Sequence, residues 1–148
     1  MAKPRKSKRP SGASSSARAP QPELTFFVDR SLGGKVVAQA LRQRGETVIV
    51  HDEVFPQDAF DEVWLTRAGA EGWIVLSKDR KIRYRANEHA ALKAAKVRAF
   101  VLTGGNMPGE AMAQAFVDAL RRMKQLTATR TPPFLAMVSA GGRVSVLW

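Results

Sequence analysis

The chain has 148 residues, of which 45% are hydrophobic, and a formal net charge of +11; it has no cysteine. This length supports one domain with a substantial core, and the lack of cysteine excludes disulfides and thiolate metal sites. No apolar run approaches the ~20 residues that span a bilayer, and the N-terminus has no secretory signal pattern. We therefore expect a soluble cytoplasmic protein with no membrane partner. Its basic charge favours a polyanion, most commonly nucleic acid.

The first 22 residues differ in composition from the rest. They are rich in proline, serine and alanine, and they contain six lysines and arginines and no acid. Such a segment offers little apolar surface to bury, so we predict a disordered basic arm over 1–22 and a folded domain over 23–148. The arm either contacts RNA or DNA electrostatically or is only a solvated tail.

From Leu24 onward, short apolar runs alternate with segments of helical periodicity. The predicted strands are residues 24–28, 47–50, 73–76 and 98–102. The predicted helices are residues 33–44, 59–70, 87–95 and 108–124. This alternation predicts an α/β fold, with helices on both faces of a mainly parallel sheet.

Details of these helices follow from the same pattern. Asn87 is a plausible N-cap for the third helix, and Pro108 lies near the first turn of the fourth. The residues expected to face the core in the first two helices are Val36, Val37, Ala40, Leu41, Val63, Trp64 and Leu65.

The C-terminal segment has a different pattern. The runs FLAMV (134–138) and RVSVL (143–147) flank a Ser-Ala-Gly-Gly turn, which predicts a β-hairpin over 134–147. We expect an antiparallel addition at the sheet edge. Its role is structural or the seating of a partner, and a homodimer through this edge is one alternative.

Acidic residues follow the predicted strands. Asp29, Asp52 and Asp79 come at or just after strand ends, and Asp61 begins the second helix at the same edge. Ligands of open parallel sheets bind at this edge, so the acids are expected to converge there. Carboxylates without cysteine or histidine partners favour Mg²⁺ or Mn²⁺, ions that promote phosphodiester hydrolysis.

Basic residues surround the third of these acids. In GWIVLSKDRKIRYR (72–85) five lysines and arginines surround Asp79. If Asp79 binds metal, Arg83 and Arg85 are the expected contacts to a phosphate backbone, together with Arg30 beside Asp29. Structural alternatives remain: Asp29 and Asp61 as helix caps, Asp79 as a turn residue and its bases as a solvated loop.

Other candidates carry a weaker signal. His51 and His89 lack a ligand spacing, and we expect structural or surface roles for both. Tyr84, among arginines, is a candidate for stacking on a base. The turn at 104–105 is Gly-Gly but lacks the lysine and spacing of a P-loop.

Three segments carry a resemblance to a known family: FFVDRSLGGKVVAQALRQRG, FDEVWLTRAGAEGWIVLSKDRKIR and NEHAALKAAKVRAFVLTGG. From about Phe26 to Met123 the chain resembles the PIN-domain superfamily, in the PIN-like group related to VapC-type toxins. The resemblance implies a three-layer α/β/α sandwich and a metal-dependent ribonuclease.

The resemblance also implies roles for individual residues. Asp29, Asp61 and Asp79 match the family's three metal-binding acids, and Ser77 matches the small hydroxyl residue before the third. The family often has a fourth acid after the third; the positions just after Asp79 are basic, and Glu88 is the nearest later acid. Glu88 is either that fourth ligand or the N-terminal charge of its helix.

The resulting hypothesis is a Mg²⁺- or Mn²⁺-dependent endoribonuclease of PIN type. Its catalytic residues are Asp29, Asp61 and Asp79, its metal ligands are these three with Glu88, and its RNA contacts are Arg30, Ser77, Arg83 and Arg85. A toxin neutralised by an antitoxin protein is implied by the resemblance. The alternative is a non-catalytic nucleic-acid-binding module of the same fold.

Overall fold

The computed structural model describes residues 24–148, apart from the side chain of Arg83. The basic arm predicted for 1–22 lies outside the described residues. The strands are β1 (Thr25–Val28), β2 (Thr47–Val50), β3 (Ile74–Ser77), β4 (Arg98–Leu102), β5 (Phe134–Ser139) and β6 (Arg143–Val146). The helices are η1 (Arg30–Leu32), α2 (Val36–Gln43), α3 (His51–Val54), α4 (Asp61–Glu71), α5 (Arg80–Tyr84), α6 (Ala86–Ala95) and α7 (Gly109–Thr129).

The six strands form one sheet in the order β2-β1-β3-β4-β5-β6. The first five are parallel, and β6 is antiparallel to β5. The predicted parallel sheet and the predicted edge hairpin are therefore both confirmed.

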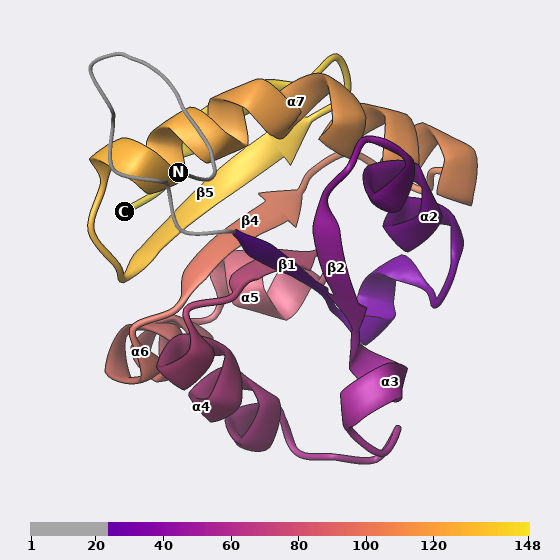
Figure 1. Ribbon diagram of the computed structural model, residues 1–148. Coiled ribbons are helices and arrows are strands. Elements are labelled where there is room, and N and C mark those ends of the chain that lie inside the picture. The colour runs from indigo at the N-terminus through magenta and orange to yellow at the C-terminus, as the bar shows by residue number, and fades with distance from the viewer. Residues whose placement is uncertain (1–23) are drawn as a thin grey trace, which may run out of the picture.

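Helices cover both faces of this sheet, which gives three layers (Figure 1). On one face, α2 and α7 pack over strand residues such as Phe26 and Val28. On the other, α4, α5 and α6 pack over Phe27 and Val75. Successive residues of a strand point to opposite faces, so the uninterrupted apolar runs supply both cores at once.

Several details of the sequence prediction are corrected. Helix α2 begins only at Val36, because a 3₁₀ turn and Gly33, at φ 81°, precede it. Val36 and Val63 do not face the core, with 41% and 52% of their surfaces exposed. Asn87 is not an N-cap, since α6 begins at Ala86 and Arg85 occupies the N-cap position.

The last helix is longer than predicted. It continues past Lys124 to Thr129, and the hydroxyls of Thr127 and Thr129 donate to carbonyls one turn back, on Met123 and Gln125. These bonds let β-branched residues continue the helix. Within the described residues, no helix is long and apolar enough to cross a bilayer.

Candidate active site

The pairing of β1 with β3 sets the positions of the acids at the carboxyl ends of these strands. Val28 lies opposite Leu76, and the backbone N–H of Asp29 donates to the Leu76 carbonyl at 3.0 Å. Strand β3 extends one residue further than predicted and ends at Ser77. The pairing thus places the side chains of Asp29 and Ser77 against each other at the carboxyl ends of two neighbouring strands.

Asp29 is a buried carboxylate held by two hydroxyls. It is 5% exposed, and its Oδ2 accepts from Ser77 Oγ at 2.5 Å and from Ser31 Oγ at 3.1 Å. Burial raises the pKa of Asp29 above its usual value; the hydroxyl bonds offset part of this effect, and the negative charge of Asp79 adds to it. The site therefore disfavours charge on Asp29 unless a cation is near.

The two serines also fix the chain that follows β3. The backbone N–H of Asp79 donates to Ser77 Oγ at 3.0 Å, and that of Lys78 donates to Ser31 Oγ at 2.9 Å. Ser77 thus links two acids 50 positions apart in sequence. Ser31 links Asp29 to the backbone N–H of Lys78. This role was not predicted, and the position of Ser31 two residues after Asp29 was the only sequence signal for it.

Asp61 lies in the first turn of α4 and is bound by two groups. Its Oδ1 accepts from the Arg30 guanidinium at 3.2 Å and from the Trp64 indole Nε1 at 3.1 Å. The N-cap position belongs to Phe60, so the capping interpretation of Asp61 is wrong. Trp64 was predicted as a core residue, and its ring is buried as expected, but its N–H also orients an acid.

Asp79 has a local structural role as well. Its Oδ1 accepts from the backbone N–H of Lys81 at 2.9 Å and so caps α5. The turn interpretation of Asp79 is correct in this respect. The cap engages Oδ1 alone, which leaves the second oxygen for another ligand.

Glu88 lies in the first turn of α6 and is electrostatically coupled to two of these acids. Burial raises its pKa, and the charges of Asp61 and Asp79 raise it further, while Lys81 and Arg85 lower it. Together with the effect of Asp79 on Asp29, this coupling joins all four predicted metal ligands into one acidic neighbourhood.

The other candidates from the sequence are Asp52 and three arginines, and each has its own surroundings. Asp52 is exposed and binds His51 Nδ1 at 3.1 Å, which lowers its pKa. Arg30 pairs with Asp61 and also donates to the Gln57 carbonyl. Arg85 is exposed at the junction of α5 and α6, and the side chain of Arg83 lies outside the described part.

The acidic neighbourhood fits a divalent cation in charge and ligand type. Burial is the main cause of the raised pKa values of Asp29 and Glu88; the charge of Asp79 adds to both, and that of Asp61 adds to the pKa of Glu88. Oxygen ligands of this kind suit Mg²⁺ or Mn²⁺. The carboxylates do not converge on a single point: among residues 24–148, no three His, Asp or Glu are grouped so that they could hold an ion. Asp61 is held by its ion pair with Arg30, and Asp79 is held by the backbone N–H of Lys81 at the start of α5.

Comparison with known proteins places the chain in a family. A family model described as a PIN like domain matches residues 24–104, the segment that carries all four acids. "Putative ribonuclease VapC45" of Mycobacterium tuberculosis is 31% identical over 127 residues, which cover 82% of this chain and 91% of that protein. No solved structure matches the chain.

Proposed function

The chain belongs to the PIN-like domain family, and from that premise we propose that it is a Mg²⁺- or Mn²⁺-dependent endoribonuclease. The observation that carries the proposal is the geometry at the ends of β1 and β3. The Ser77 hydroxyl donates to the buried Asp29 carboxylate at 2.5 Å and accepts the backbone N–H of Asp79 at 3.0 Å, so two of the proposed metal ligands meet at one edge of the sheet. A relative that matches over most of both chains and bears the name of a ribonuclease supports the same activity.

Asp29, Asp61, Asp79 and Glu88 would hold the metal. A bound ion would activate a water and neutralise charge on the phosphodiester.

The chain's own residues prepare that site. Ser31 and Ser77 orient Asp29, and the Trp64 indole orients Asp61. Arg30 pairs with Asp61 and follows Asp29 in the chain, which supports it as a contact to an RNA phosphate at the same edge. Arg85 is exposed and close enough to affect Glu88, which suits a second phosphate contact.

The test is cleavage of a mixed RNA pool by the purified full chain in Mn²⁺, in Mg²⁺ and in EDTA, beside Asp79→Asn. We expect metal-dependent cutting that the variant loses. RNA that remains uncut in every lane would reject the nuclease.

A non-catalytic RNA-binding module is the second candidate. Two observations favour it: Asp61 is paired with Arg30 at 3.2 Å, and no three ligands converge on one point among the described residues. This candidate predicts RNA binding that EDTA does not change and no cleavage in Mn²⁺.

Regulation by an antitoxin protein is part of the proposal, because the chain resembles VapC-type toxins. Such a partner would cover the acidic edge. Expression together with the product of a neighbouring small open reading frame tests it: we expect co-purification and loss of RNA cleavage, and full cleavage by the co-expressed protein would reject it.

A further inference from the structure

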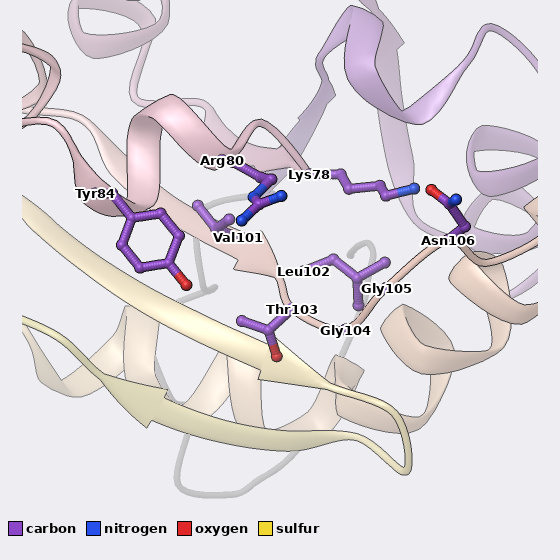
Figure 2. A pocket seen from close by; sticks show the side chains of 9 residues that line it. All are labelled: Lys78, Arg80, Tyr84, Val101, Leu102, Thr103, Gly104, Gly105 and Asn106. Atoms are coloured by element: carbon purple, nitrogen blue, oxygen red, sulfur yellow. The ribbon is translucent and has the colours of Figure 1, made fainter.

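A hollow of about 490 Å³ lies beside the acidic edge, between α5 and the loop that follows β4 (Figure 2). Its walls come from two segments of chain, residues 78–84 and 101–106. The residues that line it are Lys78, Arg80, Tyr84, Val101, Leu102, Thr103, Gly104, Gly105 and Asn106. None of the four acids of the site is among them.

The hollow shares its wall with the acidic site. Lys78 and Arg80 line it and flank Asp79 in the chain, while the charge of Asp79 acts on Asp29 and Glu88. The segment 78–80 therefore presents cations to the hollow and a carboxylate to the site. A polynucleotide bound in the hollow is therefore positioned to continue into the acidic site.

The cationic side chains and the exposed glycine backbone that line the hollow suit the binding of an anion. Two of its lining residues are cationic and none is acidic. In Figure 2, the Lys78 side chain extends across the hollow toward Asn106. Gly104 and Gly105 leave the backbone of the floor uncovered, and a Cβ built on Gly105 would meet nothing within 4 Å. A phosphate can therefore approach the backbone closely.

One wall carries an aromatic ring. Tyr84, at the end of α5, lines the hollow and is 61% exposed. An exposed ring beside cations is the arrangement on which an unpaired base stacks while its phosphate is bound. A base held in a duplex would have no free face for this ring.

We propose that this hollow binds a nucleotide of single-stranded RNA that flanks the cleaved phosphodiester, with Lys78 and Arg80 on its phosphate and Tyr84 stacked on its base. The inference rests on the proposed nuclease function. It assigns two phosphate contacts, Lys78 and Arg80, that the sequence analysis did not name, and it gives the stacking candidate Tyr84 a place in the same hollow. Arg30 and Arg85, two of the arginines predicted to contact the phosphate backbone, are not among the residues that line the hollow.

Binding in EDTA tests the phosphate contacts without cleavage. The probe is a fluorescein-labelled pool of random 12-nucleotide RNAs, titrated with the full chain at several salt concentrations. Lys78→Ala and Arg80→Ala should each weaken binding about two- to tenfold and reduce the log–log salt slope by roughly 0.7, the value for one phosphate on a single strand. Lys78→Ala keeps the backbone N–H that bonds Ser31.

Arg121→Ala is the matched control, because Arg121 is an exposed cation of α7 outside the hollow. Its effect on affinity should be smaller than that of either hollow variant. Equal effects of Lys78→Ala, Arg80→Ala and Arg121→Ala would overturn the inference, as would a wild-type chain that binds no RNA.

The ring is tested by a pair of substitutions. Tyr84→Ala should weaken binding about fivefold or more, and Tyr84→Phe should restore most of the affinity, since stacking needs only the ring. Thermal melting of both variants checks that they are folded. A folded Tyr84→Ala that binds RNA as tightly as the wild type would reject the stacking contact.

Cleavage in Mn²⁺ separates this inference from the proposed function. If both are correct, Lys78→Ala should raise KM severalfold with kcat within about twofold. If the wild type cuts nothing but the binding differences remain, the nuclease proposal fails, and the hollow is a binding site for single-stranded RNA without a cleaved bond beside it. If the wild type cuts RNA and Lys78→Ala binds and cuts like it, the hollow inference fails.

Discussion

The hydroxyl of Ser77 donates to the buried carboxylate of Asp29 at 2.5 Å, and it accepts the backbone N–H of Asp79 at 3.0 Å. One side chain therefore fixes two acids that come from different strands. This contact is the structural centre of the acidic site, and its removal has predictable effects.

Ser77→Ala removes the hydroxyl and leaves the buried Asp29 carboxylate with one fewer donor. We expect a loss of about 1–3 kcal/mol in the free energy of unfolding at pH 7, the cost of an unsatisfied buried partner. Urea unfolding in EDTA measures it. Ser31→Ala is the control and should lose less, because Ser31 is exposed; equal losses would contradict the special role of Ser77.

The pH dependence of stability should identify Asp29 as a strained carboxylate. Its pKa is raised by burial in the folded state, so the metal-free protein loses stability as the pH rises from 3.8 through the folded-state pKa. Asp29→Asn removes this loss. In EDTA the variant should melt above the wild type at pH 7, and the difference should shrink toward pH 4.

Asp52→Asn provides a contrast of opposite sign. Its pKa is lowered, first by the hydrogen bond to His51, so its charge favours the fold above pH 3.8 and that benefit is lost as the pH falls. The variant should melt at or below the wild type at pH 7. If Asp29→Asn and Asp52→Asn shifted the melting temperature in the same direction, the strain assigned to Asp29 would be wrong.

Divalent cations should stabilise the fold if the four acids share one ion. Mn²⁺ at about 100 times its Kd should add roughly 2.7 kcal/mol to the free energy of unfolding, by mass action. Asp29→Asn and Asp79→Asn should each remove most of this gain, whereas Asp52→Asn should keep it. Calorimetric melting with and without Mn²⁺ measures the effect; an undiminished gain in both site variants would place the ion elsewhere.

The packing of α4 on α6 depends on a glycine. A Cβ built on Gly69 would lie 1.8 Å from the Ala95 carbonyl oxygen, so Gly69→Ala must push the two helices apart. We expect a destabilisation of about 1–3 kcal/mol, the usual cost of overpacking. The control is Gly34→Ala, whose Cβ would meet nothing within 4 Å; its effect should stay within about 0.5 kcal/mol.

Much of this architecture could be predicted, because four apolar runs of strand length alternate with helical segments and both faces of the sheet are buried. The same alternation of strands and helices predicted that Asp29, Asp61 and Asp79 lie at the carboxyl edge of the sheet. The short helices α3 and α5 were missed, since four or five residues are too few to show a helical period.

Other features depend on side-chain direction, which spacing alone does not give. Val63 was expected inside with Trp64 and Leu65, but neighbours in a helix point 100° apart and Val63 faces outward. For the same reason, the five bases around Asp79 were recognised as a group, yet only the structure shows that Lys78 and Arg80 line a hollow.

If the acids at the ends of β1 and β3 form one metal site that cleaves RNA, loss of a single buried carboxylate should abolish most of the activity. The decisive experiment is the single-turnover rate of RNA cleavage in Mn²⁺ by the wild type, Asp29→Asn and Asp52→Asn. We predict a fall of at least about a hundredfold for Asp29→Asn and a rate within about threefold of the wild type for Asp52→Asn, since removal of a catalytic electrostatic contact costs roughly 10²-fold or more. Undiminished cleavage by Asp29→Asn would contradict the proposed metal site.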